Sequence, residues 1–337
     1  MISMECFHGL PLVHESFLVK KYCSYMTSLL YVKIYYPLHY IHYITVYKNS
    51  ELIELFLFGN KGNTSFCFNS LVSVEQDMIN LYSAEIFKNF PEIQKIIISA
   101  SYKSYSISRS ILLSEFNDHI IQLPESIDDY YLTLGKKTRQ HLKNYKSKLL
   151  RTFTKVKFVT KYKGDIDEAI IEKIVQLSFD RMTAKGIAPG KTQADTKNFF
   201  QYCQSYGCVA YIEVDGVVAA GSISYMVGDR IFLYMISHDN SFSKYNLGQV
   251  CVLYAIQTAI ENRMSTLHLL WGDNEYKARF AGKPNILHTY AIYRSSSLSF
   301  MVDNFKAKFN RTLNATKQSK YAKPLRNFVK NYRRKNL

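Results

Sequence analysis

The chain has 337 residues, of which 47% are hydrophobic, and its formal net charge is +16. This length exceeds one ordinary core and predicts two domains of about 150 residues each. No run of 18 apolar residues occurs, and the first twenty residues lack the basic start and clean apolar block of a signal peptide, so we expect neither a transmembrane helix nor a leader. The six cysteines are scattered without zinc-like spacing, which favours free thiols, no metal and a cytoplasmic location.

Two segments carry the excess charge. Residues 130–163 hold eleven Lys and Arg and no acid, and residues 301–337 hold eleven with Asp303 as the single acid. The rest of the chain is mildly acidic. Basic surfaces of this kind suit phosphate-bearing ligands, nucleic acid or an anionic membrane surface.

The first 125 residues predict a strand-rich unit. Ser73 and Gln76 have the spacing of a capping box, which predicts a helix that ends at Phe90 before Pro91. We find no catalytic spacing in this half. Segments rich in β-branched and aromatic residues predict strands at 41–47, 51–58, 64–70, 95–99 and 117–123, with hairpin turns between the first three.

Residues 126–153 predict a long helix that is interrupted near Gly135. Leu142, Tyr145 and Leu149 recur at helical spacing on one face, and basic residues surround them. This segment joins the two halves.

The second half alternates helices and strands. Asp165 is expected to cap a helix that ends at Gly186, and Thr192 begins a capping-box pattern for the next helix. Asp215 and Gly216 between two alternating runs are a strong signal of a type I′ hairpin. Two further helices are predicted, one that begins near 247 and one over 274–281. The predicted strands are 155–162, 208–214, 217–227, 230–237, 266–271 and 287–295.

Four short motifs occur here in the order found in the CelD/BcsL-like acetyltransferases of the GNAT superfamily. Residues 131–149, YLTLGKKTRQHLKNYKSKL, resemble the opening helix of that group. The following core resembles theirs in a strand with Asp-Gly, a strand ending near His-Asp, a glycine-led helix, and Trp-Gly-Asp followed by Tyr-Lys. The resemblance covers residues 128–295, and the element order β-α-α-β-β-β-α-β-α-β resembles the GNAT fold.

The resemblance implies an α/β fold of the α+β type, with tandem GNAT-like domains whose mixed central sheets are flanked by helices. The group is related to the Fem-type peptidyl transferases, which are built from two GNAT-like domains. We therefore expect a degenerate GNAT-like domain over 1–125, a basic connecting helix over 126–154, a GNAT acyltransferase domain over 155–300 and a basic C-terminal tail over 301–337.

Gly248 stands at the mouth of a predicted helix, where glycine costs roughly 1 kcal/mol relative to alanine. Either something approaches the backbone closely there, or the glycine eases a tight turn. The resemblance implies the first reading, with the pyrophosphate of acetyl-CoA or another acyl-CoA at the helix N-terminus. The loop departs from the usual superfamily pattern, with Tyr245 in place of Gln or Arg and Val250 in place of a small residue. The expected cofactor-binding residues are Gly248, the backbone N–H groups of Asn246, Leu247 and Gln249, and the charge of Lys244.

N-acyl transfer needs a deprotonated amine, a stabilised oxyanion and a proton for the leaving thiolate. His238 and Asp239 follow the strand expected to line the thioester, and either could act as the general base. A histidine near its ordinary pKa of about 6.5 suits that role. Asp239 matches the family pattern, and its alternative is a turn former. Tyr276 could protonate the thiolate or hydrogen-bond the acceptor.

The resemblance also marks four candidate substrate-binding residues. Arg139 in the opening helix could line the acceptor site or order the domain junction. Trp271, the only tryptophan, ends a predicted strand, and Asp273 could bind the substrate amine or merely cap the next helix. Lys277 could hold a phosphate or carboxylate of the acceptor, or be an ordinary solvated lysine.

These patterns together predict a cytoplasmic acyl-CoA-dependent N-acyltransferase. The resemblance implies an acceptor amine on a small-molecule or lipid-linked amino sugar, a precursor of a surface polysaccharide or of the cell envelope. The tail 301–337 is intermittently amphipathic and could lie on an anionic inner-membrane face or stay solvated.

Two other functions fit parts of the sequence. A Fem-type transferase using aminoacyl-tRNA would suit the basic helix, but no inserted helical-hairpin arm is apparent between residues 155 and 295. A non-enzymatic protein that binds nucleic acid or membrane on an inactive GNAT scaffold would suit both basic segments. No nucleic-acid-binding motif can be distinguished from the generally high Tyr and Lys content. We therefore expect tRNA as a nucleic-acid partner only if the protein is a Fem-type transferase.

Overall fold

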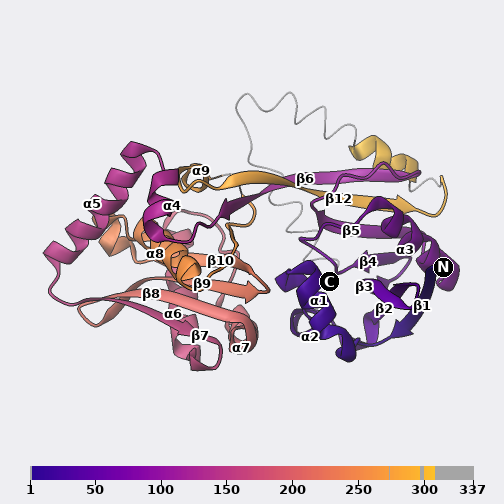
Figure 1. The fold of residues 1–337 in the computed structure, drawn as a ribbon, viewed down its shortest axis with the longest axis horizontal. Coiled ribbons are helices and arrows are strands. Elements are labelled where there is room, and N and C mark those ends of the chain that lie inside the picture. The colour runs from indigo at the N-terminus through magenta and orange to yellow at the C-terminus, as the bar shows by residue number, and fades with distance from the viewer. Residues whose placement is uncertain (1, 273, 297–299, 308–337) are drawn as a thin grey trace.

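The computed structural model describes residues 2–272, 274–296 and 300–307. Its strands form one twelve-stranded mixed sheet, in the order β1-β2-β3-β4-β5-β12-β6-β11-β10-β9-β8-β7. Helices flank this sheet, so the predicted α/β class is confirmed. Figure 1 shows two lobes, one built from the first half of the chain and one from the second.

The first lobe contains β1 (Ile2–His8), α1 (Glu15–Tyr22), α2 (Leu29–Tyr35), β2 (Ile41–Lys48), β3 (Glu51–Lys61), β4 (Thr64–Cys67), α3 (Gln76–Asn89), β5 (Lys95–Ser101) and β6 (Ser110–Gln122). The chain then forms α4 (Ile127–Thr133), α5 (Lys136–Thr152), β7 (Val156–Tyr162), α6 (Glu168–Ala184), α7 (Thr196–Tyr206), β8 (Gly207–Val214), β9 (Val217–Val227), β10 (Arg230–His238), α8 (Leu247–Glu261), β11 (Thr266–His268), α9 (Glu275–Arg279) and β12 (Lys283–Tyr293).

The last strand of the chain lies in the first lobe. β12 pairs antiparallel with β6 along most of its length and with β5 on its other side. The far end of β6 pairs in turn with β11 of the second lobe. Figure 1 shows β6 and β12 running side by side across the top of the molecule from one lobe to the other. The two halves therefore share strands, an arrangement that element order alone did not predict.

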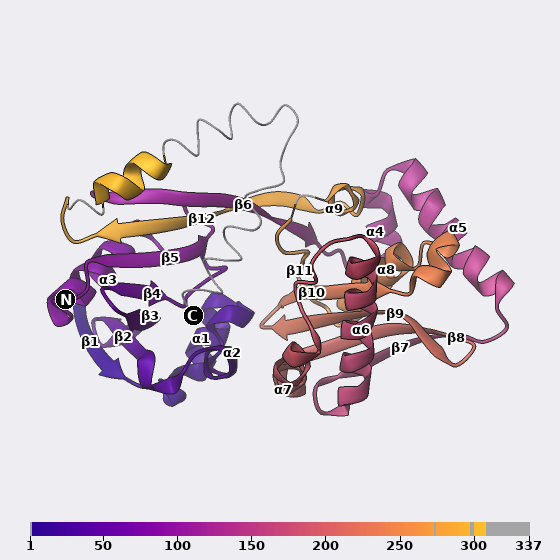
Figure 2. The same cartoon turned by 180° about the vertical axis from the view of Figure 1, so that it is seen from behind.

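Helices cover both faces of the second lobe. α6 packs on β9 and β10 from the face seen in Figure 2, and α8 packs on the same strands from the face seen in Figure 1. Apolar spacing explains both helices, because Ile174 of α6 and Ile256 of α8 are fully buried. Tyr25 of the first half also joins this core, with its ring 5.1 Å from that of Phe232 and 5.4 Å from that of Tyr225.

Most turn and cap signals formed where the sequence placed them. Asp215 and Gly216 both have positive φ, as a type I′ hairpin requires. Gly135 separates α4 from α5, and Thr192 forms its capping box with Asp195. α6 ends before Gly186, which takes φ 63 in the left-handed region.

Three local predictions were wrong. The capping box of Ser73 and Gln76 does not form, because the Gln76 side chain accepts a hydrogen bond from Ser106 N at 2.7 Å. Asp167 rather than Asp165 precedes α6, since residues 163–165 form a separate short 3-10 turn. β11 ends at His268 and not at 271, because Leu270 turns the chain with φ 56.

A buried polar network lies where the lobes meet. His268 Nδ1 of β11 is 2.6 Å from Asp118 Oδ2 of β6, and the Tyr102 hydroxyl donates to the same oxygen at 2.7 Å. Asp118 is 0% and His268 2% exposed. Asp118 Oδ1 has no hydrogen-bond partner, so the Oδ2 contacts are what compensate the carboxylate for burial.

We predict that Asp118→Ala lowers the free energy of unfolding by about 3 kcal/mol, because it removes the acceptor shared by His268 Nδ1 and the Tyr102 hydroxyl and leaves these groups only their 3.3 Å contact with each other. Tyr102→Phe removes one donor and should cost about 1 kcal/mol. Urea unfolding followed by circular dichroism measures both. Equal losses in the two variants would contradict a network centred on the carboxylate.

Candidate active site

The candidate site begins where two central strands part. β10 pairs with β11 only from Arg230 to Phe232, yet β10 continues to His238. On its other side β10 stays paired with β9, with a register shift between Leu233 and Met235. Beyond Phe232 this edge of β10 therefore has no strand partner among the described residues. A ligand that pairs like a strand could continue the sheet from this edge.

The N-terminus of α8 lies just beyond the end of β10. Asp239 begins a short 3-10 segment over Asn240–Tyr245, and Asn246 then takes φ 53 before α8 starts. Asn246 N donates to Ser243 O at 3.1 Å, and Gln249 N donates to Asn246 O at 2.9 Å. Two of the three predicted backbone donors are therefore engaged within the chain. The N–H groups of Leu247 and Gly248 have no carbonyl within the helix and remain the donors of this end.

The close neighbour of Gly248 is a side chain of this protein. A Cβ at Gly248 would lie 2.8 Å from His238 Nδ1 and 3.0 Å from His238 Cε1. Any other residue would push against the imidazole. The glycine at the helix mouth is thus explained by the packing of His238, a cause that the sequence did not suggest.

His238 is a neutral imidazole at physiological pH. Burial, followed by the charges of Arg181 and Lys185, lowers its pKa to about 4, and Asp239 opposes this only in part. The prediction that His238 could act as a general base with a pKa near its ordinary value is therefore wrong. His238 Nδ1 is buried and has no hydrogen-bond partner. The ring can accept a hydrogen bond but is a weak proton acceptor.

Arg181 is the residue that the sequence analysis missed. It lies on α6 about two helical turns after Ile174, whose carbonyl accepts a hydrogen bond from Ser237 Oγ of β10 at 2.8 Å. The Arg181 side chain is half-buried, its Nε has no partner, and burial lowers its pKa. The sequence did contain one signal for Arg181, which is a cation on the same helical face as isoleucines that are buried.

Tyr276 of α9 belongs to the same electrostatic environment. Burial raises the pKa of its phenol, and the Arg181 charge opposes that shift. The phenol therefore keeps its proton at neutral pH and can donate a hydrogen bond. The charge of Arg181 on α6 therefore acts on both His238 of β10 and Tyr276 of α9.

Asp239 acts as a turn former in this structure. Its Oδ1 accepts hydrogen bonds from Ser241 N at 2.8 Å and from Ser241 Oγ at 2.7 Å. The Ser241 hydrogen bonds lower the pKa of the carboxyl, with further lowering by Lys173. An ionised carboxylate held in this way is a poor general base, so the geometry favours the alternative that the sequence left open.

Lys277 is neither a solvated lysine nor an open acceptor ligand. It is 1% exposed, and its Nζ donates to Leu270 O at 2.6 Å and to Trp271 O at 2.9 Å. The predicted substrate-binding role is therefore wrong. The ammonium closes the loop between β11 and α9, in which Trp271 is 40% exposed and packs edge-on against Phe116. Asp273 lies outside the described residues.

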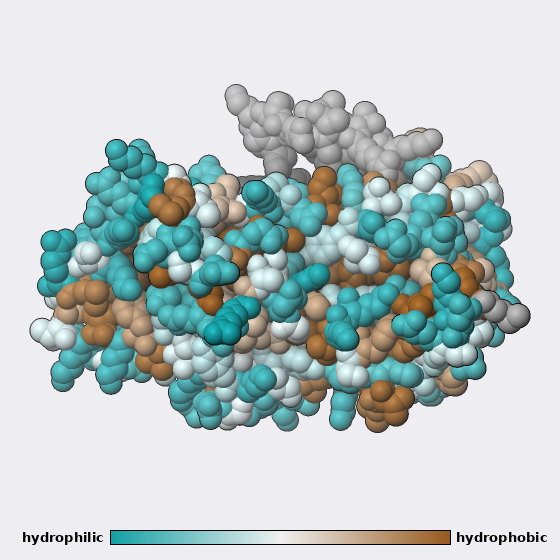
Figure 3. Space-filling model, in the orientation of Figure 1, coloured by the Kyte–Doolittle hydropathy of each residue, from teal (hydrophilic) through white to brown (hydrophobic). Residues whose placement is uncertain are grey.

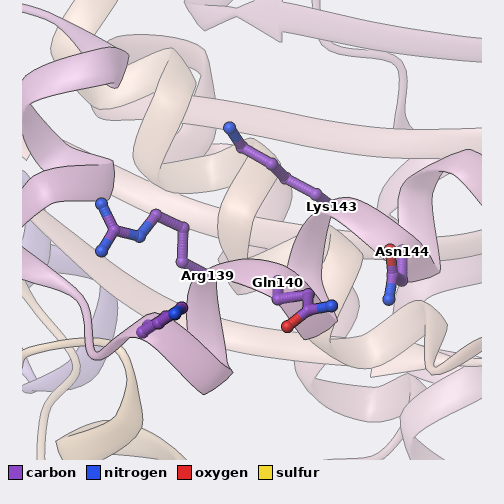
Figure 4. Close-up of a pocket in the computed structure, with 5 residues that line it drawn as sticks. Arg139, Gln140, Lys143 and Asn144 are labelled. Atoms are coloured by element: carbon purple, nitrogen blue, oxygen red, sulfur yellow. The ribbon is translucent and has the colours of Figure 1, made fainter.

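The basic residues of α5 form a separate surface. A hollow of about 550 Å³ is lined by residues of α5 alone. Figure 4 shows the side chains that line it. None of the residues around His238 contributes to it. Lys244, the predicted cofactor cation, is exposed, with its Nζ 5.1 Å from the centre of the Tyr245 ring. The lining residues are Lys136, Arg139, Gln140, Lys143 and Asn144.

The described residues contain neither a candidate metal site nor a candidate membrane-spanning helix. No group of three His, Cys, Asp or Glu side chains in that part of the chain is placed to hold a metal ion. None of its helices combines the length and apolar composition of a bilayer span. Most of the basic tail predicted over 301–337 lies outside the described residues, which end at 307.

The second lobe matches a known family. Residues 136–278, from α5 to α9, match the family described as acetyltransferase (GNAT) domain. This stretch is therefore similar to a GNAT domain, and the predicted enzyme class, acyltransferase, is confirmed. Membership of the CelD/BcsL-like group stays a prediction. No curated protein matches the chain.

Solved structures share most of the fold at low identity. FemX has a TM-score of 0.65 and 10% identity, covering 89% of this chain and 100% of its own. The C-terminal domain of a putative lysylphosphatidylglycerol synthetase from Agrobacterium fabrum has a TM-score of 0.50 and 11% identity, covering 74% of this chain and 82% of its own. L-PGS from Bacillus licheniformis has a TM-score of 0.50 and 13% identity, covering 75% of this chain and 85% of its own. These likenesses show the fold alone.

We predict that Gly248→Ala displaces the His238 imidazole, because the new Cβ would lie within 3 Å of the ring. The His238 pKa should then rise from about 4 toward its ordinary value as the ring gains water. Imidazole NMR signals followed from pH 3 to 8 measure this shift. Gly164→Ala is the matched control, since a Cβ at Gly164 meets nothing within 4 Å. An unchanged His238 titration in Gly248→Ala would refute the packing argument.

Proposed function

We propose that this protein transfers an acyl group from coenzyme A to an amine of an amino sugar, in a precursor of a surface polysaccharide or of the cell envelope. The observation that carries the transfer is the open edge of β10 beyond Phe232, which ends beside the N-terminus of α8 within the GNAT domain. The sugar acceptor rests on the resemblance to the CelD/BcsL-like group.

The donor would use both features of this edge. The N–H groups of Leu247 and Gly248 point out of the first turn of α8, and the helix dipole adds positive potential there, which suits a pyrophosphate. The edge of β10 that β11 leaves beyond Phe232 suits the pantetheine amides and the thioester. Backbone N–H groups of that edge would stabilise the oxyanion as the amine attacks.

The proton chemistry follows from His238 and Tyr276. The amine nitrogen attacks the thioester carbon, the C–S bond breaks, and the Tyr276 phenol supplies a proton to the leaving thiolate and then regains one from water. His238 accepts a hydrogen bond from the amine and orients it. Because its pKa is about 4, His238 cannot hold the released proton at pH 7, so the amine must react as the free base and release its proton to water.

A second candidate is a Fem-type transfer from aminoacyl-tRNA, which α5 specifically favours. The helix carries seven Lys and Arg without an acid, and none of the ion pairs among the described residues involves them. Figure 3 shows hydrophilic side chains gathered over this helix. Such a surface attracts a phosphate backbone. Between residues 155 and 295 the described helices form no inserted hairpin arm.

We predict that acetyl-CoA or a longer acyl-CoA binds the wild-type protein and that Gly248→Trp weakens binding at least tenfold, because an indole would fill the helix mouth. Isothermal titration calorimetry measures both, with Gly164→Trp as the control, since its site is open. Thiol release with a panel of amino sugars then tests transfer. No binding of any thioester, together with tight and salt-sensitive binding of charged tRNA, would move the assignment to the Fem-type reaction.

The rate should also carry a pH signature. We predict that kcat/KM rises with pH up to the amine pKa and shows no inflection near 6.5, because His238 is already neutral there. A bell-shaped profile with an acidic limb near 6.5, lost in His238→Gln, would instead make His238 the general base.

A further inference from the structure

Arg181 is a half-buried cation without an anionic partner. None of the ion pairs among the described residues involves Arg181, and its Nε is inaccessible to water and unbonded. A guanidinium in such a place is costly unless an anion accompanies it. The C-terminal end of α6, one turn away, supplies only partial negative charge.

The side chains around Arg181 offer donors and a neutral ring. Lys185 follows at the end of α6, and its charge reaches His238 together with that of Arg181. The Tyr276 phenol faces the same charge. The one acid that reaches His238 is Asp239, and its Oδ1 already holds two hydrogen bonds from Ser241. The group is therefore electropositive and suits an oxyanion.

The position of α6 indicates which substrate would supply that oxyanion. α8, with the helix end proposed for the pyrophosphate, covers one face of the sheet, and α6 covers the opposite face (Figures 1 and 2). His238 lies at the end of β10 between them, against Gly248 on one side and in the field of Arg181 on the other. Arg181 thus belongs to the helix on the face opposite α8, the face left for the acceptor when the donor lies at α8.

We propose that Arg181 and Lys185 form a subsite for a carboxylate or phosphate carried by the acceptor, beside the amine that His238 orients. This inference rests on the proposed acyl transfer and narrows its acceptor to an anionic amine, such as a nucleotide-linked or acidic amino sugar. Arg181 positions the acceptor through this group and takes no part in proton transfer.

Binding of simple anions tests the subsite without turnover. Acetate and inorganic phosphate are titrated into the full-length protein while the His238 imidazole is observed by NMR. An anion at Arg181 favours the imidazolium, so the His238 pKa should rise by at least half a unit in wild type and in the exposed control Arg279→Gln. In Arg181→Gln the rise should fall to less than half of that in wild type, since only Lys185 and the N-terminus of α8 remain to hold an anion near His238, although the starting pKa is higher because one cation is gone. No anion response in wild type would overturn the subsite.

Calorimetry with acetyl-CoA distinguishes the acceptor from the donor as the source of the anion. Donor affinity should change less than twofold in Arg181→Gln, and a loss of tenfold or more would assign Arg181 to the donor phosphates and overturn the inference. Transfer is then compared between glucosamine and glucosamine 6-phosphate. The phosphorylated amine should be favoured at least tenfold in kcat/KM, mainly through KM, and Arg181→Gln should abolish that preference. Equal rates would refute the subsite alone, whereas anion binding without any transfer would refute the proposed function alone.

Discussion

The insertion of β12 between β5 and β6 is the constraint on which the rest of the structure depends. It places the last described strand in the first lobe, so α9 is held between β11 and a strand that pairs within the other half. Leu269 N donates to His119 O of β6 at 2.8 Å, and the Tyr130 hydroxyl donates to Phe280 O at 3.0 Å. The first lobe therefore has a function although it contributes no candidate catalytic group, because it fixes the wall that carries Tyr276.

The second organising feature is the balance of charge around His238. Cations of α6 lie on one side and the positive end of α8 on the other, and both disfavour the imidazolium. The same two features would attract anions from the two substrates, one to each face of the sheet. A neutral ring between two anion-binding positions forms no ion pair with a bound carboxylate or phosphate, so it can still orient an amine. The low basicity of His238 therefore suits its position in the fold.

Sequence patterns predicted what is decided locally. Asp215 with Gly216 and Thr192 with Asp195 formed as expected, because a turn or a cap depends on residues a few positions apart. The pairing of β12 depends on contacts across the whole chain, and no local signal encodes it. At the site, the sequence marked Gly248 as a point of close approach but could not show that His238 fills the space. The burial of Arg181 was invisible for the same reason, since it follows from how α6 lies on β10.

The pair Tyr276 and Lys277 shows how a motif can match while the roles of its residues differ. Adjacent residues on a short helix project about 100° apart, so only one of them can face the space beyond β10. Tyr276 lies in the field of Arg181, whereas Lys277 turns inward and satisfies the carbonyls of Leu270 and Trp271. A buried ammonium with such partners holds the turn that the positive φ of Leu270 begins. Lys277 therefore has a structural role, in which it fixes the short helix that carries Tyr276.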